Sequence, residues 1–290
     1  MEISASVIGQ MLLTGVLMGS IYGAVAMGFS LIFGVAKIVN FAHAGVVVWV
    51  MYGELVAVRS GVNPYVAGVV AIPLCYVIGL GVQRTLMARV SAMSDDMQII
   101  YTFGLLLVLM YMAQFFFGPD VHNLPGSGRS IEFGGVVLQV ETIVAGVLAT
   151  GSAIALHAFL SRTWLGKAIR ASADNRRGAT LIGLDVVRLA RVAMALSFAL
   201  AALAGTILIT VTTFYPLRAF DLAVLAFVIV VLGGLDNVFG SFVAGVLIGM
   251  LEAVVTLIFS PSIAQLAIYA LIFAVLLVRP QGLLRRRVMK

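Results

Sequence analysis

Long apolar runs recur along this chain from end to end, separated by short polar or glycine-rich segments. Each run is continuous rather than alternating between apolar and polar positions, which is typical of helices and not of barrel strands. Because lipid cannot hydrogen-bond the backbone, runs of about 20 apolar residues are expected to cross a bilayer as helices. The pattern predicts an all-α integral membrane protein with about eight transmembrane helices, over residues 9–35, 42–58, 65–84, 98–117, 138–160, 190–213, 220–258 and 263–278.

Composition strengthens this prediction. Of the 290 residues, 62% are hydrophobic and only 10% are charged, which leaves too little polar surface for a separate soluble domain. A single cysteine, Cys75, excludes a disulfide framework within one chain. We therefore expect residues 1–290 to form one transmembrane domain.

Most of the positive charge is concentrated in two segments. Seven of the 18 Lys and Arg residues lie in 161–191 and five lie in 279–290. Positive charge beside membrane segments favours the cytoplasmic side, so both segments are expected in the cytoplasm, and the net charge of +6 does not indicate nucleic-acid binding. Counting spans outward from 161–191 predicts that the amino terminus and the loop 118–137 lie outside and that the carboxyl terminus is cytoplasmic.

Two apolar stretches are interrupted by segments that contain glycine and asparagine. FGVAKIVNFAHAG at 33–45 separates the first two spans, and GGLDNVFGS at 233–241 divides 220–258, which is too long for one ordinary span. The sequence leaves open whether 220–258 crosses twice or forms a re-entrant pair. Each break has an asparagine, Asn40 or Asn237, followed by small residues and an apolar helix, which is a weak internal repeat. Paired interrupted segments indicate a transport pathway, and two ordinary turns are the alternative.

Small residues at every fourth position form two ridges on the predicted helices. Such ridges let helix backbones approach closely in a membrane, so they predict helix packing and not a ligand site. The first ridge consists of Gly15, Gly19 and Gly23, and the second of Ser241, Gly245, Gly249 and Ala253.

Ionisable side chains within apolar runs are costly in lipid and are therefore candidates for function. Glu54 and Glu252 lie near the ends of their spans, where we expect structural capping or pairing rather than direct substrate contact, and Asp236 lies in the second break. His43 lies beside Asn40 in the first break, where we expect a structural or path-lining role. The sequence has no metal-binding histidine spacing, no nucleotide-binding P-loop and no G-x-S-x-G elbow. We expect no catalytic site, no metal and no cofactor in this chain.

The segment LGKAIRASADNRRGATLIGLDVVRLAR at 165–191 differs from an ordinary polar loop. Asp174 and Asn175 can cap the start of a helix, and Gly183 can end one. A loop that only fixes topology would not need residues that start and end helices. The segment therefore favours a protein-docking element. Its short helical apolar patches are formed by Leu165, Ile169, Ala173, Leu181 and Leu184.

Three stretches, 15–45, 166–184 and 231–249, carry a resemblance to a known family. The most specific elements are the N-F-A-H string at 40–43 and the basic G-x-A-x-R-A-x-A pattern that begins at Gly166. With the spacing between them, these stretches cover nearly the whole chain. The chain resembles the membrane permease of branched-chain amino-acid type ABC importers, a group that includes leucine/isoleucine/valine permeases and related urea, amide and aromatic-compound systems.

The resemblance implies a bacterial cytoplasmic-membrane permease that pairs with a second permease subunit, either a sister chain or a copy of itself. Two cytoplasmic ATPases would bind the ATP, and an external solute-binding protein would deliver the substrate. The loop 166–184 would contain the coupling helix that docks on the ATPase, with key positions Arg170, Ala171, Ala173, Asn175, Gly178, Ala179 and Gly183. The family often has alanine where this chain has Gly178. The resemblance also implies that Asn40, His43, Asp236 and Asn237 line or flank the translocation path.

The sequence leaves the substrate and the rival function open. The substrate could be a branched-chain amino acid, urea, an amide or an aromatic acid. The rival function is an ion-coupled secondary carrier of a small polar solute, in which Glu54, Asp236 or Glu252 would bind a proton or sodium.

Overall fold

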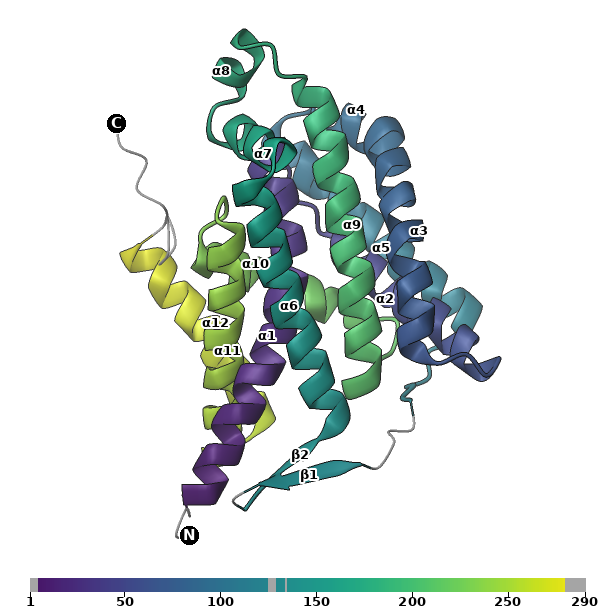
Figure 1. Ribbon diagram of the computed structural model, residues 1–290, viewed down its shortest axis with the longest axis vertical. Helices are drawn as coiled ribbons and strands as arrows, with labels where there is room; N and C mark the ends of the chain where they lie inside the picture. Colours follow the sequence, from purple (N-terminus) through teal and green to yellow (C-terminus); the bar gives the residue numbers. More distant parts are fainter. Residues whose placement is uncertain (1–4, 125–128, 134, 280–290) are drawn as a thin grey trace.

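The computed structural model describes residues 5–124, 129–133 and 135–279, which form a bundle of long helices (Figure 1). Eight helical segments of this part of the chain are long and apolar enough to cross a membrane, which confirms the predicted helical membrane fold. The helices, including the π-helical turn η1, are α1 (Ala5–Ala36), α2 (Ala42–Arg59), α3 (Pro64–Val82), η1 (Gln83–Met87), α4 (Ala88–Val90), α5 (Asp95–Phe117), α6 (Val140–Arg162), α7 (Trp164–Asp174), α8 (Arg176–Leu181), α9 (Val186–Val211), α10 (Arg218–Gly233), α11 (Val238–Ile258) and α12 (Pro261–Val278).

The two ends of the bundle carry different elements (Figure 1). We call one the hairpin end, because it holds the strands β1 (Ser130–Phe133) and β2 (Val136–Gln139) together with the start of α1. The other, the α8 end, holds α4, α7 and α8. The basic residues expected in the cytoplasm at the carboxyl terminus, Arg285, Arg286, Arg287 and Lys290, lie outside the described residues.

The β-hairpin is a departure from the helices and loops that the sequence predicts. Its strands pair antiparallel within the expected loop 118–137 and just beyond it. The preceding segment is fixed to the α9–α10 loop by two backbone bonds, from His122 N to Phe214 O at 2.8 Å and from Phe214 N to His122 O at 2.9 Å. The loop segments of the hairpin end are therefore joined to one another.

The long apolar stretch 220–258 folds as two helices, α10 and α11, that pack against each other. The chain turns between them through Gly234, whose φ of +89° suits glycine. With 16 residues, α10 is shorter than the roughly 20 residues that a typical span needs, whereas α11 has 21. The stretch therefore consists of two separate helices of unequal length.

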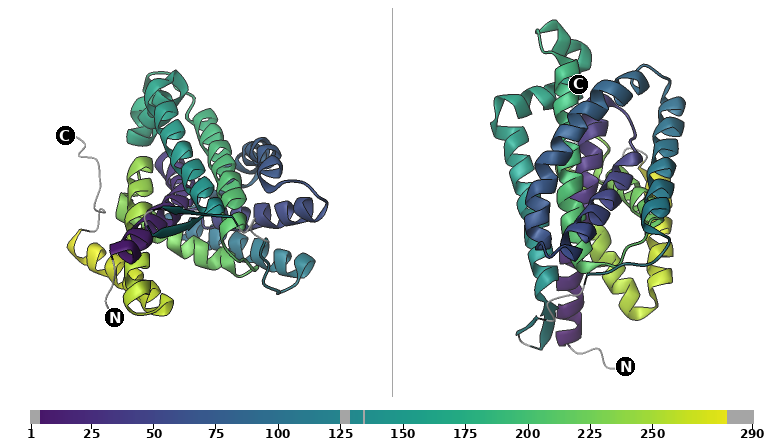
Figure 2. Two further views of the ribbon diagram at one scale, coloured as in Figure 1. Left: turned by 60° about the horizontal axis from the view of Figure 1, so that its bottom comes forward. Right: turned by 90° about the vertical axis from the view of Figure 1, so that its right-hand side faces the viewer.

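Burial divides the helices into a core and a periphery. The most hydrophobic windows of α1 and α9 are 78% and 72% buried, whereas those of α3 and α12 are only 17% buried. Figure 2 shows α3 and α5 on the outside of the bundle and α12 at its edge. Because the outer helices expose apolar side chains, lipid is the surface they suit, and α1 and α9 position the interior groups.

Candidate functional site

The connector 37–41, between α1 and α2, folds back into the bundle. The ring of His43, near the start of α2, contacts the carbonyl of Val25 with an Nε2–O distance of 3.2 Å. Val25 lies about three turns before the end of α1 at Ala36. The start of α2 therefore lies deep inside the bundle rather than at one end of the bundle. Irregular backbone at membrane depth is tolerated only where protein or a water-filled cavity surrounds it.

Contacts from other helices hold this connector in place. Lys37, where α1 ends, has a φ of +56°, in the left-handed region that helix ends often use. The Thr102 hydroxyl of α5 donates to the Val39 carbonyl at 2.7 Å. On the α9 side, the Asn40 amide nitrogen lies 4.0 Å from the sulfur of Met194. The connector is thus fixed from both α5 and α9.

His43 is fully buried and both of its ring nitrogens have contacts. Its Nδ1 lies 3.1 Å from the Ser197 hydroxyl of α9. The ring fits because Gly28 has no side chain: a Cβ there would lie 2.6 Å from the ring Cε1. These contacts give His43 a role in fixing the start of α2 against α1 and α9.

The second break lies against the end of α1. Lys37 Nζ pairs with Asp236 Oδ1 at 2.9 Å, with the two side chains 47% and 56% exposed. The Ser30 hydroxyl donates to the Leu235 carbonyl at 3.2 Å. Asn237 caps α11 by accepting a bond from Gly240 N at 2.9 Å. The structure therefore brings the two interrupted segments together through Lys37 and Asp236, while Asn40 faces α9 instead.

Aromatic rings surround the start of α2. Phe41 lies within 6.0, 6.1 and 5.5 Å of the ring centroids of Phe29, Phe103 and Phe227, respectively. Phe103 also contacts Phe220 at 6.2 Å, and these two side chains are 36% and 41% exposed. We call these five residues the aromatic cluster. It extends from the buried Phe29 to an outer face formed by α5 and α10.

The three acids proposed for an ion-coupled carrier do not meet. Glu54 is buried and contacts the Thr206 hydroxyl of α9. Glu252 lies beside the Tyr22 side chain of α1, and Asp236 pairs with Lys37. In the described part of the chain, no group of three or more His, Cys, Asp and Glu side chains could hold a metal ion.

The two small-residue ridges face each other across α1 and α11. A Cβ on Gly19 would lie 2.7 Å from the Cα of Val246, and one on Gly15 would lie 2.9 Å from the Cβ of Ala253. A Cβ on Gly245 would meet the Cα of Gly23, and one on Gly249 would meet that of Gly19. These backbones touch, as expected for small-residue packing in membranes.

At the α8 end, α7 lies against the bundle. Its Thr163 cap accepts a bond from Gly166 N at 3.0 Å. Ala168 and Ile169 are buried, and Ala173 is half-buried near Gly34 of α1. Arg170 and Ala171 are also half-buried. Much of the predicted apolar patch therefore packs inward.

By contrast, α8 projects from the bundle (Figure 1). Asn175 caps it by accepting a bond from Gly178 N at 2.9 Å, and Gly183, with a φ of +84°, follows its end. Ala179 is buried, but Leu181 and Ile182 are 87% and 75% exposed. The basic Arg176 and Arg177 on the same helix are exposed as well. The part of the loop available to another protein is thus α8.

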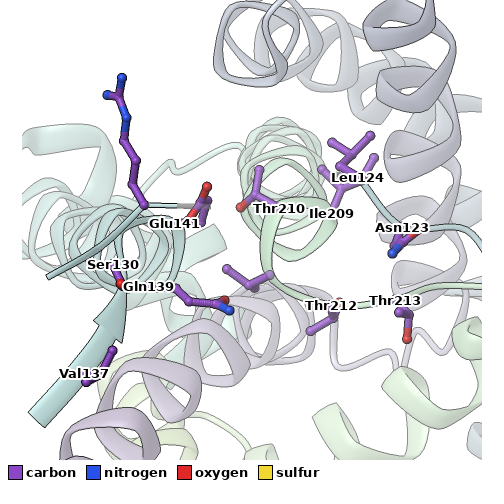
Figure 3. A pocket seen from close by; sticks show the side chains of 12 residues that line it. Asn123, Leu124, Ser130, Val137, Gln139, Glu141, Ile209, Thr210, Thr212 and Thr213 are labelled. Carbon is purple, nitrogen blue, oxygen red and sulfur yellow. The ribbon is translucent and has the colours of Figure 1, made fainter. Parts of the chain in front are cut away.

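A pocket of about 610 Å³ opens at the hairpin end between the hairpin, α6 and the end of α9. Figure 3 shows Gln139 and Glu141 on one side of it and Thr212 and Thr213 on the other. The sequence offered no signal for it, because its walls come from segments distant in the chain. It is lined by Asn123, Leu124, Arg129, Ser130, Val137, Gln139, Glu141, Ile209, Thr210, Val211, Thr212 and Thr213.

Sequence reasoning also missed Thr102, Met194, Ser197, Thr206 and the aromatic cluster. A single Ser, Thr or Met in an apolar helix is common, and phenylalanine is ordinary in a membrane span. The relevant information is the position of these residues in the folded bundle. Thr102, Met194, Ser197 and Thr206 contact the connector, His43 or Glu54 from another helix.

Comparison with known proteins identifies the family. Residues 11–276 match the family model described as "Branched-chain amino acid transport system / permease component". The chain is 26% identical to the high-affinity branched-chain amino acid transport system permease protein LivH of Escherichia coli (strain K12), over 96% of this chain and 95% of LivH. Identity to BraD of Pseudomonas aeruginosa, which has the same description, is also 26%, again over 96% and 95% of the two chains.

A probable branched-chain amino acid transport permease, LivH of Methanocaldococcus jannaschii, is 25% identical over 85% of this chain and 81% of its own length. No solved structure gives a significant match. The family model covers nearly the whole described bundle, including both breaks and the α7–α8 loop. The chain therefore belongs to the family of permease components of branched-chain amino acid transport systems, as a multi-pass transmembrane subunit with no catalytic role.

Proposed function

We propose that residues 1–290 act as a single permease domain of an ATP-driven importer and that α8 docks on a cytoplasmic ATPase. The observation that carries this proposal is the exposure of Leu181 and Ile182 on a capped helix outside the bundle. Exposed apolar side chains rimmed by basic ones are typical of protein-interaction sites. Because α7 packs on α1 and α6, movement of α8 would be transmitted to the bundle.

The substrate path runs beside the connector 37–41 and the aromatic cluster. Phe103 and Phe220 reach an outer face, which a second permease subunit, a sister chain or another copy, would cover. The aromatic lining suits an aliphatic side chain better than urea, and LivH and BraD are both described as branched-chain amino acid permeases. The proposed substrate is therefore a branched-chain amino acid.

The proposed orientation puts the amino terminus and the hairpin end outside, where a solute-binding protein would dock. The α8 end and the carboxyl terminus would be cytoplasmic, in the inner membrane of a bacterium. The basic residues of 161–191 support this orientation, because positive loops favour the cytoplasmic side.

Co-purification with the ATPase tests the docking proposal. In the double variant Leu181→Glu with Ile182→Glu, we expect the ATPase to be lost from the complex and substrate-stimulated ATP hydrolysis to fall at least tenfold. A matched control is Val121→Glu, which places the same charge on a side chain 64% exposed in the segment 118–124, near the hairpin end. The control should retain the ATPase. Full ATPase retention in the double variant would refute docking through α8.

A further inference from the structure

The start of α2 is buried but has no side-chain cap. Its N-cap residue is Phe41, whose side chain makes no capping hydrogen bond. Ala42 is 3% exposed, yet the structure gives no acceptor in the described residues for the N–H groups of Phe41 and Ala42. Free N–H groups at a buried helix end are unusual, because water cannot satisfy them there.

Asn40, the residue before Phe41, has a further unsatisfied polar group. The residue is 2% exposed and its Oδ1 has no hydrogen-bond partner. Its amide nitrogen has only the distant sulfur of Met194. Asn237 precedes α11 in the same way but uses its Oδ1 to cap that helix. Asn40 does not cap α2. Its carboxamide oxygen therefore lacks a donor, and the backbone N–H groups of the next two residues, Phe41 and Ala42, lack an acceptor in the described residues.

This combination matches the ends of a zwitterionic amino acid. A helix N-terminus carries a partial positive charge and binds carboxylates through its free N–H groups, and interrupted helices in transporters present such termini to substrates. An ammonium group needs acceptors, which a carboxamide oxygen supplies. The rings of Phe41, Phe103 and Phe227 lie beside the same helix end and offer an apolar surface.

We propose that the N-terminus of α2 and Asn40 bind the amino acid during its passage. The N–H groups of Phe41 and Ala42 donate to its carboxylate, its ammonium donates to Asn40 Oδ1, and its aliphatic side chain lies on the aromatic cluster. This inference rests on the proposed function, since it concerns the same path. It selects α-amino acids over urea, which carries no charge, and over aromatic acids that lack an ammonium group.

The sequence allows a single-site test. Asn40–Phe41 is the only Asn–Phe pair in the chain, and Asn237–Val238 is the only Asn–Val pair. Labelling asparagine with ¹³C at the carbonyl and phenylalanine with ¹⁵N therefore selects the Phe41 amide in solid-state NMR of the permease complex in lipid bilayers. The corresponding Asn and Val labels select the Val238 amide as a control at a capped helix start.

Titration with L-leucine should shift the Phe41 signal in a saturable way and leave the Val238 signal unchanged. Neither 4-methylpentanoate, which lacks the ammonium, nor 3-methylbutylamine, which lacks the carboxylate, should reproduce the shift at equal concentration. No shift with leucine, an equal shift at Val238, or an equal shift with either analogue would overturn the proposal.

A variant in reconstituted vesicles separates this inference from the proposed function. Asn40→Leu should lower leucine transport about tenfold or more, as expected when a hydrogen bond to a charged group is lost, while the ATPase stays bound. Its control is Gln114→Leu, which also removes a buried amide oxygen without a partner, from the far end of α5. Normal transport by Asn40→Leu would refute the site and leave the importer standing, whereas failure of the wild-type complex to transport would refute the importer.

Discussion

The connector 37–41 depends on single hydrogen bonds from residues distant in sequence. Thr102 supplies one to the Val39 carbonyl, and the His43–Ser197 contact ties the first turn of α2 to α9. In a bundle interior, a backbone carbonyl without a partner costs about 1–3 kcal/mol. Each of these hydrogen bonds therefore contributes substantially to the stability of the irregular connector 37–41 inside the bundle.

Thr102→Val should lower the free energy of unfolding by about 1–3 kcal/mol, because valine has the same shape and leaves Val39 O unpaired. The loss of stability is measured by the thermal unfolding transition of the purified chain in detergent. The control is Thr85→Val, whose exposed hydroxyl donates to Gly81 O, four residues earlier at the end of α3, at 2.9 Å. Equal transition temperatures for Thr102→Val and the wild type would show that the bond does not hold the connector.

The sequence predicts part of this site at residue level. Asn40 and His43 are recognisable because polar side chains are rare in apolar runs. The contacts that Val39 receives from α5 and His43 receives from α9 are not recognisable, because pairing of residues 63 and 154 positions apart depends on the folded bundle. The absence of a cap on α2 is also invisible in the sequence, since Asn40 and Asn237 stand in similar surroundings but only Asn237 caps its helix.

At the scale of elements, apolar run length predicts the long helices within a few residues. The β-hairpin and the short α10 are harder to predict, because neither has a strong period and both are fixed by neighbouring segments. The ridges predict close packing, yet only the structure pairs the ridge of α1 with that of α11. Two ridges on different helices carry no information about which partner each takes.

Gly19→Ala should destabilise the chain by about 1–3 kcal/mol, since its Cβ would lie 2.7 Å from the backbone of Val246 and force α1 and α11 apart. Gly53→Ala on α2 is the matched control, because nothing lies within 4 Å of a Cβ there. Comparison of the two thermal transitions measures the difference. If both variants unfold at the same temperature, α1 and α11 do not depend on this close approach.

Asn175→Ala should loosen α8, because loss of an N-cap costs about 1 kcal/mol in a helix of six residues. We expect ATPase affinity to fall about fivefold, with little change in the melting temperature of the bundle. Asn175→Asp keeps a capping acceptor and should bind the ATPase normally. Equal ATPase affinity for the alanine and aspartate variants would argue against a capped α8 as the docking element.

In the whole molecule, the basic residues of 161–191 and the order of the spans favour a hairpin end outside the cell and an α8 end in the cytoplasm. Cys75 is the only cysteine and is buried, so Cys75→Ala gives a background for single-cysteine labelling. In intact cells, a membrane-impermeant maleimide should label Val121→Cys, whereas Ile182→Cys should react only after the membrane is opened. The reverse pattern would invert the proposed orientation.

The family and the helix count follow from long-range sequence pattern, but the arrangement of subunits does not. Faces of α5 and α10 that a second permease would cover have the same apolar composition as faces that meet lipid. The source of energy is likewise a property of the assembly, because the chain has no nucleotide-binding motif of its own.

In the proposed importer, ATP acts through α8 to drive leucine through this permease. The most direct measurement is uptake of radiolabelled leucine into vesicles that contain the complete complex, with ATP on the α8 side and the loaded binding protein on the hairpin side. Uptake should require ATP, persist when ionophores collapse the ion gradients, and disappear in the Leu181→Glu, Ile182→Glu variant. Uptake driven by a proton or sodium gradient without ATP, abolished by Asp236→Asn or Glu252→Gln but unaffected by the α8 variant, would contradict it.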